Sequence, residues 1–138
     1  MKETLMRRSI AISLLAAVAL TACNEQPQQK QTPIKVTGPE QQALHKLDAI
    51  NLAIALKRAI YGAGYTCKTI TDAGFVATYQ NLDMWMAHCT YERSAARDWA
   101  IFAGPDGSAQ VRDCKDVAAS GLPPCRIAKR PAGNFNKL

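Results

Sequence analysis

The hydrophobic and polar positions of the chain change their period once, close to residue 65. Before it, from about residue 41 to 61, apolar side chains recur at the three- and four-residue spacing of an α-helix. The segment Thr37-Gly38-Pro39-Glu40 has the form of a capping box with proline in the first turn, and Gly62 and Gly64 provide a stop. We therefore expect one long helix of about 22 residues, roughly 33 Å in length.

The apolar stripe of this helix is broad. The centre of the stripe consists of Leu47, Ile50, Ile54 and Tyr61. On one side it is widened by Ala49, Ala53, Leu56 and Ile60. We expect the stripe to cover a sheet, because the strands that follow need a cover. Pairing with a partner helix, or contact with a bilayer, remains the alternative use of so wide a stripe.

From Tyr65 onward the alternation has the period of a β-strand. The expected strands cover 66–71, 75–80, 84–92, 99–103 and 109–113. Gly104-Pro105-Asp106-Gly107 is the strongest turn signal between them. The strand at 84–92 is apolar on both faces, so we expect it to be central. The proline- and glycine-containing segment 115–138 should be irregular, and the fold class is α+β: one long N-terminal helix packed on an antiparallel sheet of four or five strands.

The start of the chain has a different organisation. Lys2, Arg7 and Arg8 precede an apolar run of 11 residues from Ile10 to Leu20. Spanning a hydrocarbon core of about 30 Å takes roughly 20 apolar residues in a helix, so this run is too short. Its length and positive flank are those of the hydrophobic region of a signal peptide.

The residues that follow, Leu20-Thr21-Ala22-Cys23, resemble the lipobox of bacterial lipoprotein precursors. The resemblance implies that residues 1–22 are a signal peptide, that Cys23 receives a diacylglyceryl group and an amide-linked acyl chain such as palmitate, and that it becomes the first mature residue. Asn24 stands where an aspartate would favour retention in the inner membrane, so the implied location is the periplasmic face of the outer membrane. The inner membrane is the less favoured location. An ordinary secretory signal followed by a chance cysteine is the alternative.

The 116 residues from Cys23 onward fall into segments of different composition. Residues 23–37 are rich in Gln with two prolines and little to bury, which predicts a flexible tether behind the lipidated cysteine. We expect a small domain over 38–126 and a basic disordered tail over 127–138.

The net charge of the mature chain is small. Removal of the signal peptide, with Lys2, Glu3, Arg7 and Arg8, leaves 14 basic and 10 acidic residues, a net charge of +4. That mild charge and an envelope location exclude nucleic acid as a partner, while contact of the tail with an acidic surface stays open.

Setting Cys23 aside leaves an even number of cysteines, which are Cys67, Cys89, Cys114 and Cys125. In a small exported domain this predicts two disulfides, for which three pairings exist. We favour Cys67 with Cys89 across the sheet, and Cys114 with Cys125 near the proline-rich segment. A metal site built from these thiols with His45 or His88 is the rival, but no C-x-x-C or H-x-x-H spacing is present, so we expect no metal.

Catalytic patterns are weak. His45 or His88 could act as a general base. A serine nucleophile is not indicated, because none of Ser94, Ser108 and Ser120 lies in a G-x-S-x-G motif. Asp113 and Asp116 form a carboxylate pair of the kind that is usually only solvated. We expect no enzyme activity and no cofactor besides the covalent lipid on Cys23; a small hydrolase or a thiol enzyme would require a free cysteine.

These observations favour a membrane-anchored lipoprotein that acts as a non-catalytic accessory or binding module of the cell envelope, with an envelope protein as its partner. Outer-membrane assembly factors are similar in architecture only. The alternative is an inhibitor of an envelope-attacking hydrolase such as lysozyme. Known membrane-bound lysozyme inhibitors resemble all-β barrels, and the expected long helix argues against that alternative.

Overall fold

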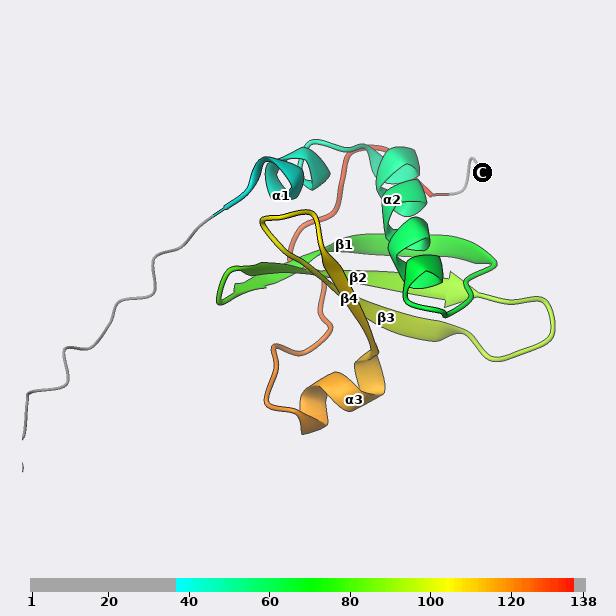
Figure 1. Cartoon of the computed structure of the whole chain (residues 1–138). Helices are drawn as coiled ribbons and strands as arrows, with labels where there is room; N and C mark the ends of the chain where they lie inside the picture. Colours follow the sequence, from blue (N-terminus) through cyan, green and yellow to red (C-terminus); the bar gives the residue numbers. More distant parts are fainter. Residues whose placement is uncertain (1–36, 136–138) are drawn as a thin grey trace, which may run out of the picture. The chain divides into compact units, whose positions relative to one another are not determined.

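The computed structural model describes residues 37–135. The predicted signal peptide, Cys23 and all of the tether before Thr37 lie outside the described residues. The elements in chain order are α1 (Pro39–Leu44), α2 (Ala49–Gly62), β1 (Thr69–Tyr79), β2 (Leu82–Thr90), β3 (Arg97–Ala103), β4 (Ala109–Asp113) and α3 (Cys114–Ala119). The strands form one antiparallel sheet in the order β1-β2-β3-β4 (Figure 1). The α+β class and the antiparallel sheet are confirmed.

The expected single long helix is wrong, because the chain divides it into α1 and α2. Helix α2 begins with an N-cap of its own, Asp48, whose carboxylate accepts hydrogen bonds from the backbone and side-chain nitrogens of Asn51, at 2.8 and 3.0 Å. The first helix also starts one residue later than the capping-box pattern suggests. Its N-cap is Gly38, whose N–H donates to Oε1 of Gln41 at 2.9 Å.

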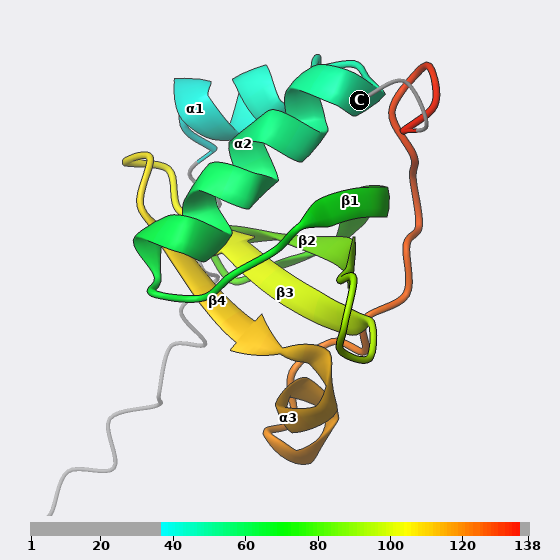
Figure 2. The same ribbon diagram turned by 90° about the vertical axis from the view of Figure 1, so that its right-hand side faces the viewer.

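Helix α2 crosses one face of the sheet (Figure 2). Its buried residues are Ala49, Leu52, Ala53, Leu56 and Ile60. The stripe through Ile54 and Tyr61, which we expected at the centre of the buried face, is turned outward: these side chains are 39% and 51% exposed. The sheet receives the neighbouring stripe, in which small alanines let the helix approach closely.

Strand β1 joins the two strands expected at 66–71 and 75–80. The expected break at Asp72-Ala73-Gly74 is an irregular stretch of one strand, with register shifts against β2 between Ile70 and Asp72 and between Phe75 and Ala77. The prediction of a central strand at 84–92 is confirmed by β2, which pairs on both sides and buries Met84, Trp85, Ala87 and Cys89.

The face of the sheet opposite α2 packs against α3 and the loop that follows it (Figure 1). The buried cluster there consists of Val76, Met84, Ala100 and Phe102 from the sheet and Val117 from α3. We expected residues 115–138 to be irregular, but α3 covers the first of them, with Asp113 as an N-cap that accepts from the N–H of Lys115 at 3.0 Å. Both faces of the sheet are therefore covered.

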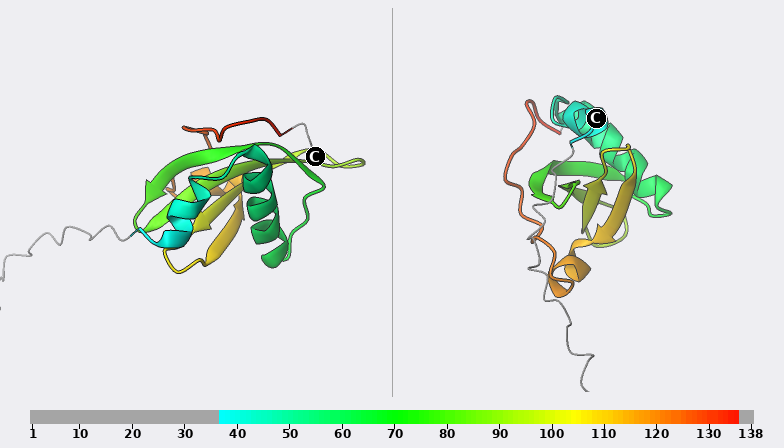
Figure 3. Two further views of the ribbon diagram at one scale, coloured as in Figure 1. Left: turned by 90° about the horizontal axis from the view of Figure 1, so that it is seen from above. Right: turned by 60° about the vertical axis from the view of Figure 1, so that its left-hand side comes forward.

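Residues 127–135 differ from the disordered tail that their composition predicts. They form a strap that runs past β1 toward the start of α2, as Figure 2 shows and the two views of Figure 3 repeat. Ala128 N–H donates to the carbonyl of Phe75 at 2.8 Å, Phe75 N–H donates to that of Lys129 at 2.9 Å, and Ala49 N–H donates to that of Ala132 at 2.8 Å. Phe135 is buried in the core. The compact domain thus continues past residue 126.

Candidate functional site

Both expected disulfides are present. Cys67 and Cys89 are joined with a Cα–Cα distance of 5.4 Å, linking the segment before β1 to β2, and both residues are fully buried. Cys114 and Cys125 are joined at 5.9 Å and close the loop after α3. The cysteines therefore act as structural cross-links in the described part of the chain.

The two histidines each face a carboxylate. Nε2 of His45 lies 2.9 Å from Oδ2 of Asp83, and Nδ1 of His88 lies 2.5 Å from Oδ1 of Asp98. The His88 pair is about two-fifths exposed on the sheet, whereas Asp83 is buried. Each carboxylate orients one imidazole ring.

Within the described residues, Ser108, Ser120, Asp113 and Asp116 form no side-chain hydrogen bond to either histidine. Ser108 donates to Asp106 at 2.6 Å, and Ser120 donates to the backbone oxygen of Asp116 at 2.8 Å. Asp113 caps α3 and lies 3.6 Å from Arg97. Between residues 37 and 135 no cluster of three or more His, Cys, Asp or Glu has the geometry to hold a metal ion. No helix in that range is long and apolar enough to cross a membrane.

The most distinctive surface of the described residues is the outer side of α2. Ile54 and Tyr61 are large hydrophobic residues exposed there, at 39% and 51%, and Tyr65, just after the helix, is 41% exposed. All three belong to α2 or to the three residues that follow it. Scattered single apolar residues are normal on a surface, but a gathering on one element is typical of a contact site.

A groove of about 260 Å³ lies beside Ile54, between α2 and the start of β1. Its floor and walls come from Ala53, Ile54 and Lys57 on the helix and from Lys68, Thr69 and Ile70 on the other side. Two lysines thus border an apolar groove. We name the set Ile54, Lys57, Tyr61, Tyr65 and Lys68 the α2 surface.

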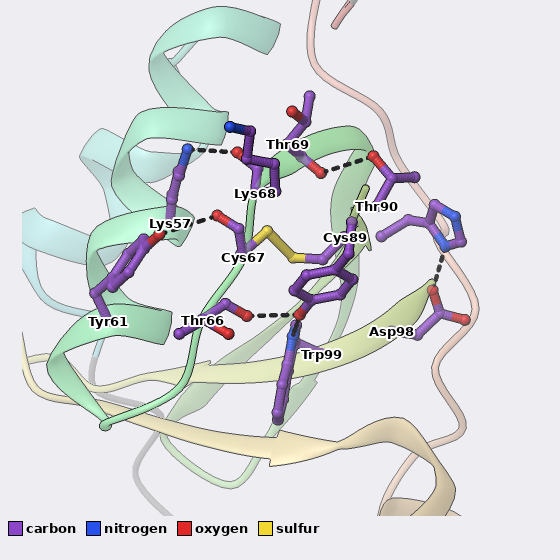
Figure 4. The surroundings of a disulfide bond; sticks show 12 residues. Lys57, Tyr61, Thr66, Cys67, Lys68, Thr69, Cys89, Thr90, Asp98 and Trp99 are labelled. Carbon is purple, nitrogen blue, oxygen red and sulfur yellow. Dashed lines mark hydrogen bonds and ion pairs between the residues drawn. A yellow bond between two sulfur atoms is a disulfide. The ribbon is translucent and has the colours of Figure 1, made fainter. Parts of the chain in front are cut away.

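Hydrogen bonds from α2 hold the segment that carries Lys68 in place (Figure 4). Nζ of Lys57 donates to the carbonyl oxygen of Lys68 at 2.7 Å, and Tyr61 donates to that of Cys67 at 3.3 Å. The disulfide to Cys89 ties the same segment to β2 from the other side. The α2 surface is therefore a preformed platform.

Aromatic contacts extend this platform at the end of α2. The ring of Tyr65 packs on that of Trp99, with centroids 4.5 Å apart. The indole nitrogen of Trp99 donates to the hydroxyl of Tyr91 at 3.5 Å, and Tyr91 donates to the carbonyl of Thr66 (Figure 4). Tyr65 is consequently held over the sheet with one ring face outward.

Sequence reasoning placed Ile54 and Tyr61 in the core and so did not find this surface. The available signal was the doubling of the apolar stripe on α2: one side consists mainly of alanines and leucines, the other of Ile50, Ile54 and Tyr61. A helix on one sheet buries a single stripe. The second stripe then indicates a second contact.

Comparisons with known proteins returned no match: no protein family, no curated protein and no solved structure matches the chain.

Proposed function

We propose that the chain is a lipid-anchored protein of the bacterial cell envelope that acts as a non-catalytic accessory or binding module, and that the α2 surface contacts its protein partner. The proposed lipid attachment and envelope location rest on the resemblance of residues Leu20 to Cys23 to a lipobox. The two disulfides support an oxidising compartment, which the periplasm provides. The periplasmic face of the outer membrane is the proposed location.

The observation that carries the binding role is the exposure of Ile54 and Tyr61 on one side of α2, with Tyr65 exposed just after the end of that helix. Tyrosine is enriched in protein interfaces, where its ring buries apolar area and its hydroxyl keeps a polar partner. Truncation of such residues at the centre of an interface commonly costs more than about 1 kcal/mol each in binding.

Charge around the platform favours an acidic partner. Lys57 and Lys68 border the groove, and Arg58 follows on the exposed side of α2. The carboxylate of Glu92 lies 3.2 Å from Lys68, but both of those side chains are more than three-fifths exposed, which leaves them free to exchange partners. Acidic residues around an apolar patch would complement this surface and steer association.

Site-specific cross-linking in intact cells tests the proposal. A photoreactive amino acid at Ile54 should give a discrete protein adduct, whereas the same group at Arg93, in the exposed loop between β2 and β3, should not. Equal adducts at both positions, or none at Ile54, would remove the assignment of this surface. In parallel, inhibition of lysozyme by the purified protein would favour the inhibitor alternative over an accessory module.

A further inference from the structure

A second cavity, of about 150 Å³, lies on the β1 side of the domain and shares no residue with the α2 surface. It is enclosed by the turn between α1 and α2, by Phe75 and Trp85 of the sheet, and by residues 129–132 of the strap. Figure 2 shows the strap rising beside β1 toward that turn. Segments that are distant in the sequence thus meet around one small space.

Three rings form the walls of this cavity. The ring centroid of His45 lies 4.7 Å from that of Phe75 and 4.8 Å from that of Trp85, and the Phe75 and Trp85 centroids are 5.6 Å apart. Their tilted and edge-on arrangements are those that aromatic pairs prefer. The cavity therefore presents an aromatic lining of defined shape.

Partly buried hydrogen bonds fix the orientation of the histidine ring. Asp83, only 4% exposed, binds Nε2 of His45 with one carboxylate oxygen and accepts from the hydroxyl of Thr78 with the other, at 2.9 and 3.0 Å. A carboxylate held in this way locks the ring and leaves Nδ1 as its second polar atom. Such support is typical of preorganised binding sites.

Trp85 combines a ring in the cavity wall with a buried N–H that has no partner among the described residues. The indole N–H of Trp85 makes no hydrogen bond within residues 37–135, although Trp85 is only 3% exposed. A buried donor without an acceptor is costly, and native structures rarely leave one. Because that nitrogen is itself inaccessible to solvent, a ligand in the cavity contacts the ring of Trp85 and not its N–H.

The charge around the cavity is of one sign. Lys46, Lys129 and Arg130 contribute to its lining, and no carboxylate does. Arg130 is held by Asp72, with hydrogen bonds of 3.0 and 2.8 Å, whereas Lys46 and Lys129 form no ion pair with the described residues. This positive charge around an aromatic cavity is suited to an anion with an apolar body.

We propose that this cavity binds a carboxylate attached to a single apolar ring, either as a free aromatic acid or as the carboxyl-terminal residue of a peptide. An apolar cavity of about 150 Å³ is of the size that accepts benzene, so one ring fills it. The carboxylate lies toward Lys46 and Lys129, and the ring lies against Phe75, Trp85 and His45. This site is separate from the α2 surface and does not depend on the proposed function.

Two-dimensional NMR of the purified protein provides the test, because the chain has two tryptophans and hence two indole N–H signals. Titration with phenylacetate should shift the Trp85 signal to saturation and leave the Trp99 signal in place. Phenylacetamide, which lacks the charge, should bind at least about tenfold more weakly, a difference of about 1.4 kcal/mol. A capped tripeptide ending in phenylalanine, with a free carboxylate or as its amide, distinguishes the peptide source from the free acid.

Two variants test the role of the lysines. Combined Lys46→Gln and Lys129→Gln substitutions should weaken phenylacetate binding by about tenfold or more, whereas Lys115→Gln, an exposed cation on α3, should not change it. Because all three lysines are exposed, the substitutions should leave the fold intact, which the unchanged Trp99 signal would verify. The proposal is overturned if neither carboxylate ligand shifts Trp85, if acid and amide bind equally, or if the lysine variants bind as the parent does.

Discussion

Gln41 donates a hydrogen bond of 2.9 Å to the carbonyl oxygen of Ala103, the last residue of β3. The same amide nitrogen donates to the carbonyl of Asn81 at 2.9 Å, and its oxygen accepts from Gly38. Gln41 is 1% exposed. One buried amide thus joins α1 to the β1–β2 turn and to the end of β3.

Replacement of this amide should be strongly destabilising. Gln41→Leu keeps an apolar body but leaves three backbone groups without their partner, and we expect a loss of about 2–4 kcal/mol in the free energy of unfolding. Urea denaturation measures it. The adjacent exposed Gln42 provides the control, since Gln42→Leu should change stability by less than about 0.5 kcal/mol. Similar losses for both variants would contradict the role of the buried amide.

The position of the strap beside β1 should depend on Gly74. A Cβ built on Gly74 would lie 2.5 Å from the carbonyl oxygen of Lys129 and 2.5 Å from Cγ2 of Ile127, so Gly74→Ala must displace the strap. We expect a loss of about 1–3 kcal/mol and faster hydrogen exchange at the amides of Phe75 and Ala128, which bond across this contact.

Gly62→Ala is the matched control for that substitution. Gly62 ends α2, and no atom lies within 4 Å of the position that an added Cβ would take, so alanine should be tolerated. Unchanged exchange in Gly74→Ala would show that the strap is not held at this point.

The two disulfides should contribute unequally. Loop closure alone predicts about 3 kcal/mol for each, because the cysteines are separated by 22 and 11 residues. Cys67 and Cys89 are fully buried under α2, whereas Cys114 and Cys125 are partly exposed. Replacing the first pair by alanine should therefore cost more, since it also leaves a cavity in the core. Thermal unfolding of the two double variants gives the comparison, and a larger loss for the second pair would contradict it.

Acid titration should report on the turn between β3 and β4. The hydroxyl and then the backbone N–H of Ser108 bind the carboxylate of Asp106 and lower its pKa below the ordinary value. A lowered pKa in the folded state stabilises the protein above the unfolded pKa, and this contribution is lost as the pH falls through the folded pKa, below about pH 4.

Ser108→Ala removes the larger of these two effects, so the pKa of Asp106 should rise. Carboxyl-detected NMR titration measures it directly. In Ser120→Ala, which loses a hydroxyl bound to the backbone of Asp116, the pKa of Asp106 should stay as in the parent. An Asp106 pKa that is the same in all three proteins would refute the assigned cause.

Lipid attachment at Cys23 is open to a direct test. Cells grown with a palmitate analogue should label the parent protein, and Cys23→Ser should abolish both the label and the membrane association. A variant that still takes label and stays with membranes would exclude this cysteine as the anchor.

The sequence was sufficient for features whose cause is local or periodic. The period of two locates β2, and the even cysteine number predicts two disulfides, of which Cys67 with Cys89 is a favoured pairing. The turn at residues 104–107 forms where its proline and glycines indicate, with Gly107 at a φ of +79°.

Features whose cause is tertiary were out of reach. In the sequence Gly74 indicates a break in a strand, but it is required by the close approach of the strap to β1. From the sequence, Asp48 could lie on the polar side of one long helix or cap the start of a second helix. The packing of α1 against the end of β3 decides in favour of two helices. The α2 surface was missed because two apolar stripes of similar strength compete for one sheet.

The strap also sets an order of events in the making of the protein. A chain is synthesised from its N-terminus, and here the N–H of Ala49 at the start of α2 is satisfied by the carbonyl of Ala132. Phe135, a member of the core, comes later still. The core is therefore completed only after the strap has left the ribosome, so α2 and the sheet are synthesised before the residues that join them at this end of the domain.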